Sequence, residues 1–326
     1  METVTVSKQT VSKSNVGTYI LLIATTTFWG SAFVTSKISV GVVPPTVAAF
    51  IRFGLGAIFA ILLLLLLHSR DKTVRLIPKG SWFGIIILGF IGVAVYNLLF
   101  FWGLAFSRAS DGSMIIPTLS PAITVILAAL FLKERFGRQQ ITGLGLTLIG
   151  SAVFFSAIGF TGIVNTSRII GDLLFLAAAA CWSAYTLLGK KVLQKVSPLL
   201  ATAYAMFFGS IILGVVSVRD FGEIQWSSLG LGFWLNQFYL ALFPSVLANW
   251  FYYLGIKRIG ASRASVFMYF VPVSGLILSG LILDDVLTFL QFVGSAIMIF
   301  GLWVINKHHP SKKNLRMLSN NSKNIP

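Results

Sequence analysis

Long apolar segments, separated by short polar and charged ones, dominate this chain. Charge-free stretches cover 14–36, 80–107, 112–132, 139–167, 173–189, 196–218, 224–256, 264–283 and 286–306, and the run 46–67 contains a single charge, Arg52. About 20 apolar residues suffice for a helix to cross the hydrocarbon core of a bilayer. The runs lack the alternation of polar and apolar residues that is typical of outer-membrane barrels. The pattern predicts an all-α polytopic membrane protein with ten transmembrane helices, at 17–37, 44–67, 82–104, 112–132, 138–158, 170–190, 198–218, 232–255, 263–283 and 286–306.

A second pattern is a repeat at a spacing of 151 to 153 residues. The equivalent pairs are Trp29/Trp182, Lys37/Lys190, Asn97/Asn249, Gly103/Gly255, Pro121/Pro272, Glu134/Asp285, Gly143/Gly294 and Gly150/Gly301. Self-similarity in the same order along the chain indicates a duplicated unit. We therefore expect two five-helix units, 17–158 and 170–306, with a linker at 159–169 and tails at 1–16 and 307–326. Because five is an odd number of crossings, the second unit is predicted to run inverted relative to the first.

The charges support membrane topology rather than binding of nucleic acid. The chain is 56% hydrophobic and 10% charged, whereas a soluble domain is about 25% charged. Although the net charge is +16, twenty of the 25 Lys and Arg residues fall on one side of the ten-span arrangement and four on the other. The positive-inside rule then places both termini in the cytoplasm. We expect a multi-pass protein of the cell membrane that contacts lipid and no nucleic acid.

An inverted repeat implies transport, because this architecture forms a pathway at the interface of the two units and exposes it to each side in turn. We expect a secondary transporter or facilitator for small polar metabolites, such as amino-acid-like solutes or drugs, with export as one direction. The alternatives are a membrane scaffold without transport and a membrane-embedded enzyme. An enzyme would need a nucleophile–base pair or a metal cluster within the spans, and the pattern predicts neither.

Arg52 is the ionisable residue that lies well inside an apolar span. An arginine at the bilayer centre costs about 2.5–3.5 kcal/mol on insertion scales. One interpretation is that Arg52 faces the pathway and binds an anionic group or a carbonyl. The other is a structural arginine that reaches the interface or clamps helices together.

Further pathway candidates lie at matched depths of the two units. Asn97 and Asn249 are each surrounded by aromatic residues, among them Tyr253, and an amide can donate and accept hydrogen bonds to a polar solute; the alternative is an interhelical hydrogen bond. Trp29 and Trp182 lie in mid-span, which favours a cavity or packing over an interfacial belt. Pro121 and Pro272 are predicted to interrupt spans four and nine, as a static kink or at a transport site.

The sequence also predicts that several kinds of chemical site are absent. Cys181 is the single cysteine, so no disulfide or cysteine metal cluster is expected, and no phosphate-binding glycine loop occurs. We therefore expect no cofactor and no metal. Asp111, Glu134, Asp172, Asp284 and Asp285 are predicted at helix ends and none of them in mid-span, so proton coupling is not supported, although Asp111 or Asp172 could relay a proton at a mouth of the pathway. Gly143/Gly150 and Gly294/Gly301 indicate close helix packing, with a homodimer face as the alternative.

Several of these motifs resemble the drug/metabolite transporter superfamily in its ten-helix EamA form. The resemblance rests on "FWGSAFVTSK" around Trp29, the lone Arg52, "LSPAITVILAALFLKERF" and "GLGLTLIG", with partial copies in the second half. It covers residues 17–306 and implies the ten-helix fold and a transport activity. Two features depart from the family pattern. In the family, the acid after the fourth helix is usually a Glu preceded by Gly, whereas here the pairs are Lys133–Glu134 and Asp284–Asp285. The second-half counterpart of Arg52, near Ala205 or Met206, carries no charge.

Overall fold

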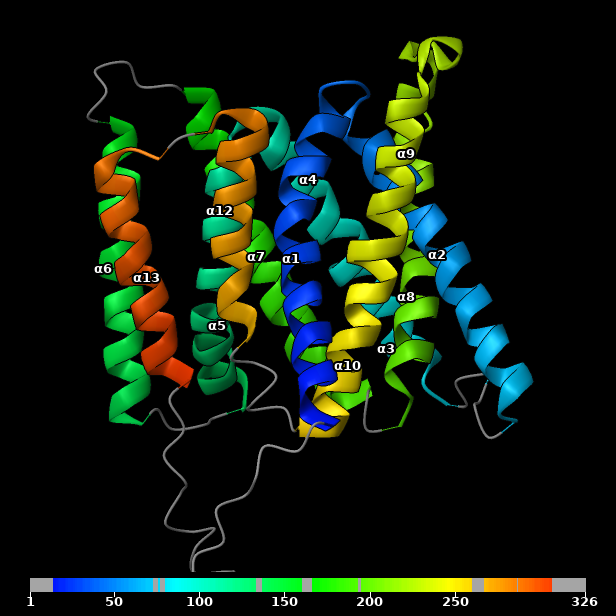
Figure 1. The fold of residues 1–326 in the computed structure, drawn as a ribbon, viewed down its shortest axis with the longest axis horizontal. Coiled ribbons are helices and arrows are strands. Elements are labelled where there is room, and N and C mark those ends of the chain that lie inside the picture. Colours follow the sequence, from blue (N-terminus) through cyan, green and yellow to red (C-terminus); the bar gives the residue numbers. More distant parts are fainter. Residues whose placement is uncertain are drawn as a thin grey trace, which may run out of the picture.

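The fold is a bundle of helices, and no strand occurs among the residues that the structure describes (Figure 1). The computed structural model describes residues 14–72, 76, 80–132, 137–159, 166–192, 195–259, 267–285 and 287–306. Most of the predicted N-terminal tail, the predicted C-terminal tail 307–326, part of the predicted linker and Glu134 lie outside these residues.

In the first half, the helices are α1 (Ser14–Val40), α2 (Pro45–Arg70), α3 (Trp82–Leu88), α4 (Tyr96–Phe106), α5 (Ala109–Leu132) and α6 (Arg138–Gly159). In the second half, they are α7 (Thr166–Val192), α8 (Pro198–Ser217), α9 (Leu231–Leu240), α10 (Ala248–Ile259), α12 (Phe270–Leu283) and α13 (Phe289–Asn306). Three short 3₁₀ turns are η2 (Asp220–Glu223), η3 (Trp226–Ser228) and η5 (Phe267–Tyr269). Several helices extend beyond the predicted apolar runs, because polar residues continue a helix outside the hydrocarbon. In contrast, the helix predicted at 286–306 begins only at Phe289. The backbone N–H of Thr288, just before it, donates to Oε1 of Gln291.

Two π-helical segments occur at matched places, η1 (Gly89–Val95) between α3 and α4, and η4 (Ala241–Leu247) between α9 and α10. They begin 152 residues apart, which is the spacing of Asn97 and Asn249. Pro244 lies inside η4 and lacks a backbone N–H, which is one cause of a local change in the hydrogen-bond pattern. Such segments are rare and often accompany functional sites. The apolar pattern predicted the spans but not these segments.

The surface of the bundle is that of a multi-pass membrane protein. Among the described residues, six helices are long and apolar enough to cross a membrane, and three shorter ones are also apolar. The six are Val16–Val40, Pro45–Arg70, Trp82–Phe106, Thr166–Gly189, Pro198–Ser217 and Leu231–Tyr252, and the shorter ones are Ile141–Ser156, Phe270–Leu283 and Phe289–Gly301. Large apolar side chains such as Phe83 (79% exposed) and Phe289 (82% exposed) point outward. A soluble monomer rarely exposes so many large apolar side chains, so this surface suits lipid.

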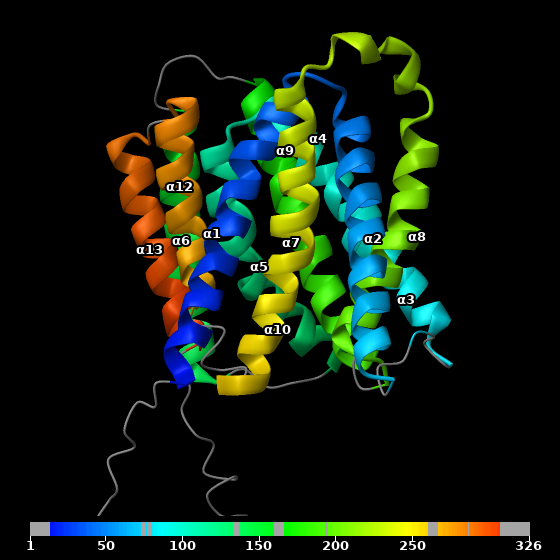
Figure 2. The same cartoon turned by 45° about the vertical axis from the view of Figure 1, so that its right-hand side comes forward.

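Contacts between the two halves occur in pairs, in which each helix of the first contact is replaced by its equivalent from the other half in the second. α1 packs against α12 as α5 packs against α7, and α1 packs against α10 as α4 packs against α7. The segment η1 contacts α8, whereas η4 contacts α2. The contacts of α2 with α8, of α6 with α13 and of α5 with α12 join equivalent helices of the two halves. In Figures 1 and 2, α6 and α13 lie toward one edge of the bundle and α2 and α8 toward the other.

The helices α1 and α7 run in opposite directions. Lys37, near the end of α1, donates to the carbonyls of Leu104 and Ser107 at the end of α4. Ser107 in turn contacts Asp172 in the first turns of α7. The end of α1 and the start of α7 therefore share one end of the bundle, whereas α1 begins and α13 ends at the other (Figure 1).

The four cations that were predicted to lie opposite the termini gather at the end of the bundle where α7 begins. Lys37, Arg108 and Arg168 belong to the contacts around Ser107 and its neighbours. Arg219 adjoins Asp220, which accepts a hydrogen bond from Thr46 at the start of α2. Exposed cations at the other end include Arg70, Arg138, Lys195 and Arg258. These described cations lie at the two ends of the bundle, and the complete sorting of charges stays a prediction.

The glycine pairs that suggested close packing bring α6 and α13 together within the chain. A Cβ atom at Gly150 would lie 2.6 Å from the backbone nitrogen of Met298, and one at Gly294 would lie 2.6 Å from that of Phe154. A Cβ at Gly301 would lie 2.6 Å from the nitrogen of Thr147. Because these backbones already touch, this glycine face is occupied by an intramolecular contact and is not free to form a homodimer.

We expect Gly150→Ala to lower the stability of the protein. The added methyl group meets backbone atoms of α13 that cannot rotate away, and overpacking of this kind costs about 1–3 kcal/mol. The check is the apparent Tm in detergent. Gly145→Ala on the same helix is the control, because no atom lies within 4 Å of its Cβ position. Equal melting temperatures for both variants would contradict the packing.

Candidate functional site

A cavity of about 390 Å³ lies between the two halves of the bundle. It is lined by α1, α2, η1, α4 and α5 from the first half and by α7, α8, η4, α10 and the η5–α12 region from the second. Its lining residues are Trp29, Ala32, Phe33, Arg52, Phe53, Gly92, Val93, Tyr96, Asn97, Phe100, Ile116, Pro117, Ser120, Pro121, Thr124, Trp182, Tyr185, Thr186, Thr202, Ala205, Met206, Pro244, Ser245, Asn249, Met268 and Val271. A mostly apolar cavity of this size with a few polar groups is typical of a small-molecule site.

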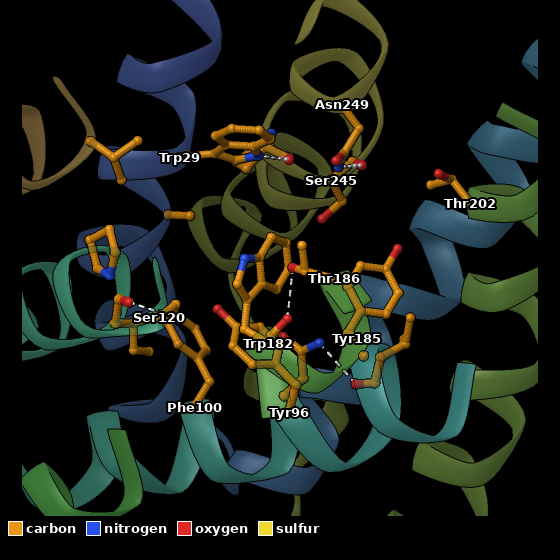
Figure 3. Close-up of a pocket in the computed structure, with 18 of the residues that line it drawn as sticks. Trp29, Tyr96, Phe100, Ser120, Trp182, Tyr185, Thr186, Thr202, Ser245 and Asn249 are labelled. Carbon is orange, nitrogen blue, oxygen red and sulfur yellow. Dashed lines mark hydrogen bonds between the residues drawn. The ribbon is translucent and has the colours of Figure 1, made fainter. Parts of the chain in front are cut away.

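Aromatic rings form much of the cavity wall. Trp182 lies between Tyr96 and Tyr185, with ring centroids at 5.2 and 5.4 Å. Trp29 donates from Nε1 to the backbone oxygen of Pro244 at 3.1 Å, which ties α1 to the π-helical segment η4. In Figure 3, Trp29 approaches the cavity from one side and Trp182 and Tyr185 from the other. Both tryptophans line the cavity, and their part in a transport pathway stays a prediction.

Arg52 reaches the cavity from α2 and is only 7% exposed. Its Nε donates to Ser245 Oγ and its Nη1 to Ser36 Oγ, both at 3.1 Å. The guanidinium also lies over the ring of Phe53, with 5.0 Å to the centroid. No carboxylate of the described residues forms an ion pair with it. Neutral hydroxyl and ring partners leave its positive charge uncompensated, so the cavity wall is electropositive at this point.

The cavity is asymmetric in charge. The repeat counterpart of Arg52 was expected near Ala205 or Met206, and both of these residues line the same cavity. A solute would therefore meet a cation on α2 and an apolar surface on α8. The asymmetry distinguishes two orientations of a bound solute, because an anionic end gains only on the α2 side.

Asn97 and Asn249 line the cavity and make the same hydrogen bond in both halves. Each Nδ2 donates at 2.8 Å to the carbonyl four residues earlier, that of Val93 in η1 and that of Ser245 in η4. The neighbouring backbone N–H groups of Tyr96 and Ala248 instead bond carbonyls five residues back, as π-helical geometry requires. Both side chains therefore bond within their own helix, and among the described residues neither makes the interhelical hydrogen bond that was the alternative. Each amide supports the irregular segment beside it.

The prolines divide into two groups. Pro117 and Pro121 line the cavity and lie inside α5, which runs unbroken from Ala109 to Leu132, so the helix is not broken at Pro121 and the alternative of a static kink stays a prediction. Hydroxyl groups of Thr118 and Ser120 bond carbonyls of the preceding turn and help to keep this stretch helical. Pro272 does not line the cavity; it occupies the first turn of α12, where a missing N–H costs nothing. Span nine was predicted at 263–283, whereas α12 begins at Phe270, directly after the 3₁₀ turn η5, so the regular α-helix starts just before Pro272.

The remaining predictions, and the site residues that the sequence did not reveal, concern single positions. The side chain of Tyr253 lies outside the described residues. Ser36 and Ser245, which hold Arg52, were missed because isolated serines in apolar runs give no pattern of their own. Pro244 could have been noticed as a proline inside the predicted span 232–255. Among the described residues, no group of three His, Cys, Asp or Glu side chains could hold a metal ion.

A model of the EamA-like transporter family matches the chain twice, at residues 16–156 and 169–307. The chain belongs to the EamA-like transporter family. This match confirms the resemblance to the EamA form that the motifs around Trp29, Arg52 and Gly150 indicated. EamA membership and the apolar helices together make the chain a multi-pass membrane transporter.

Similar proteins agree with this assignment. The chain is 32% identical to the uncharacterized transporter YyaM of Bacillus subtilis, over 87% of this chain and 92% of the relative. It is 26% identical to a probable terminal-alkyne amino-acid exporter of Streptantibioticus cattleyicolor, over 88% of this chain and 92% of that protein. A crystal structure with 18% identity has the same fold, with a TM-score of 0.60 over 89% of this chain and 97% of the other.

Proposed function

We propose that this EamA protein is a secondary transporter or facilitator that moves small polar metabolites across the cell membrane by alternating access at the interface of its halves. The observation that carries the proposal is the cavity between the halves, to which both contribute an equivalent tryptophan and an equivalent asparagine. A site shared by two inverted units near mid-membrane is the arrangement on which alternating access depends.

The proposed architecture has ten spans in two inverted five-helix units. The six long apolar helices, the three shorter ones and α5, whose 24 residues are mostly apolar, supply ten segments. The opposite directions of α1 and α7 and the exchanged contact pairs support the inversion. With twenty cations on the side of the termini, that side is cytoplasmic.

The proposed substrate has an anionic group and an apolar body, as an amino-acid-like solute does. Arg52 offers the charge-assisted hydrogen bonds, the rings of Trp29, Tyr96 and Trp182 offer apolar contact, and Asn97 and Asn249 offer amide groups. One relative is named a probable amino-acid exporter, which supports the same class of solute and the outward direction.

Counterflow into sealed proteoliposomes tests the function. Vesicles loaded with an unlabelled amino-acid mixture should accumulate labelled amino acids when the protein is present, and a matched set of uncharged sugars should show no accumulation. Counterflow needs no coupling ion, so it detects secondary transporters and facilitators alike. Protein-free vesicles are the control, and equal uptake with and without protein for every solute would contradict transport of this class.

Labelling of single cysteines tests the topology. In a Cys181→Ser background, Gly222→Cys should react with a membrane-impermeant maleimide from outside intact cells, and Lys72→Cys only after the membrane is opened. Both positions are exposed, Gly222 in η2 at one end of the bundle and Lys72 after α2 at the other. The opposite pattern would place the termini outside and reject the assignment.

A further inference from the structure

Two buried aspartates meet at the end of the bundle where α7 begins, away from the cavity. Asp111 in α5 is 0% exposed and Asp172 in α7 is 1% exposed. Arg168 donates two hydrogen bonds to Asp111, from Nε to Oδ2 at 2.7 Å and from Nη2 to Oδ1 at 2.9 Å. Ser107, between α4 and α5, lies between the two carboxyl groups. We call Ser107, Asp111, Arg168 and Asp172 the acidic junction; none of them lines the cavity.

The hydrogen bonds of the acidic junction require one extra proton. Ser107 Oγ lies 3.1 Å from Asp111 Oδ2 and 2.6 Å from Asp172 Oδ1. A hydroxyl has one hydrogen and an ionised carboxylate can only accept, so Ser107 can donate to only one of the two. For both contacts to be hydrogen bonds, one carboxyl group must carry a proton and donate it to Ser107. Asp111, held at both oxygens by a guanidinium, is the ionised member.

Asp172 is therefore the member that holds the proton. Its second oxygen, Oδ2, is buried and has no hydrogen-bond partner among the described residues. A neutral acid tolerates one unpaired carbonyl oxygen, whereas a buried carboxylate with a single donor pays several kcal/mol of desolvation.

The other charged and polar groups nearby already have partners. Lys37 of α1 donates to the carbonyls of Leu104 and Ser107. Arg108 lies 3.7 Å from Asp285, which follows α12, and Asp285 also accepts from Ser279. Gln291 of α13 approaches Asp111 Oδ1 at 3.5 Å. Of these groups none contacts Asp172, so none compensates a negative charge on it directly.

The acidic junction lies where tight packing closes the bundle. A Cβ at Gly171 would lie 2.7 Å from the nitrogen of Ser107, and the ring of Phe175 fits against Gly103 and Gly112. Along α4, α5 and α7, the residues between the acidic junction and the cavity lining include the fully buried Phe101, Leu104, Met114, Ile115 and Phe175. The cavity lining instead extends to Thr186 and Thr202, toward the end where α7 finishes. The hydrogen bonds of the acidic junction thus connect α7 to the turn between α4 and α5, on the closed side of the cavity.

We propose that Asp172 is a proton-binding site that controls opening of this end of the transporter. With the proton bound, Asp172 donates a hydrogen bond to Ser107, and α7 stays in contact with α4 and α5. When the proton leaves Oδ1 for water, Ser107 can satisfy only one of two carboxylates, and the new charge gains solvation only if α7 separates from them. Loss of one proton therefore favours the open end. The inference rests on the proposed alternating access.

Infrared spectroscopy of the purified protein tests the proton. The wild type should show the carbonyl stretch of a protonated carboxylic acid, and this band should titrate away as the pH is raised. It should be missing in Asp172→Asn, which keeps the size of the side chain and a donor for Ser107, and be retained in Asp71→Asn, the same change at an exposed site. Ser107→Ala should shift the band, because the acid loses its acceptor. A band that survives in Asp172→Asn, or no band in the wild type at acidic pH, would overturn the assignment.

Maleimide labelling of the purified protein tests the opening. In a Cys181→Ser background, Ser110→Cys places a thiol beside the acidic junction at a position that is 1% exposed. Its labelling rate, divided by that of exposed Gly222→Cys to correct for thiol ionisation, should rise along a one-proton curve. The curve should be flat when Asp172→Asn is added. Identical profiles with Asp172 and with Asn would overturn the link to opening. Neither measurement uses a solute, so each stands apart from success or failure of the counterflow experiment.

Discussion

Arg52→Gln should reduce counterflow of an anionic or zwitterionic solute about 30-fold or more, while the amount of folded protein is maintained. The variant keeps a hydrogen-bonding side chain near Ser36 and Ser245 but removes the uncompensated charge from the cavity wall. Truncating one partner of a buried charge pair costs about 2 kcal/mol or more, which corresponds to that factor. The measurement is the initial counterflow rate per molecule of purified protein at several solute concentrations.

Arg52→Lys separates charge from geometry. Lysine retains the positive charge but lacks the planar fork that holds a carboxylate at two points, so we expect a weaker apparent affinity with counterflow still detectable. Arg219→Gln, an exposed arginine at the end of α8, is the matched control and should transport normally. If both Arg52 variants instead lose folded yield while the surviving protein keeps its affinity, Arg52 serves the packing of α2 on η4 and not the solute.

Asn97→Leu and Asn249→Leu should each reduce counterflow about tenfold, because each removes a polar contact of the cavity and a bond to an η1 or η4 carbonyl. A buried carbonyl left without its donor costs about 1–3 kcal/mol. We expect the Asn97 variant to be less stable as well, since this residue is only 2% exposed. The checks are the counterflow rate per molecule and the apparent Tm of each purified variant.

Asn236→Leu is the matched control for the asparagines. Asn236 donates across helices, to the Thr35 carbonyl and to Ser39 Oγ, and does not line the cavity. It should lower the Tm and leave the affinity for solute unchanged. If all three variants behave alike, the cavity asparagines are structural and contribute nothing particular to transport.

Several features of this chain followed from its sequence alone. Apolar runs of about 20 residues predicted a helical membrane bundle because an exposed backbone polar group is too costly in lipid. The spacing of equivalent residues predicted the duplicated pattern, and the family match at 16–156 and 169–307 has the same spacing. Arg52 was conspicuous because a charge in an apolar span is expensive, and the structure places it at the cavity.

Tertiary structure alone decided which helix faces which. The sequence showed that Gly150 and Gly294 each need close contact, but not that they contact each other's helices rather than a second molecule. It showed Asp111 and Asp172 as acids at separate helix ends, whereas the fold buries both against Ser107. Pro121 and Pro272 looked equivalent, yet only Pro121 lines the cavity. The physical reason is that apolar patterning records how each residue partitions between lipid and water, while the neighbours of a buried polar group depend on packing between helices distant in sequence.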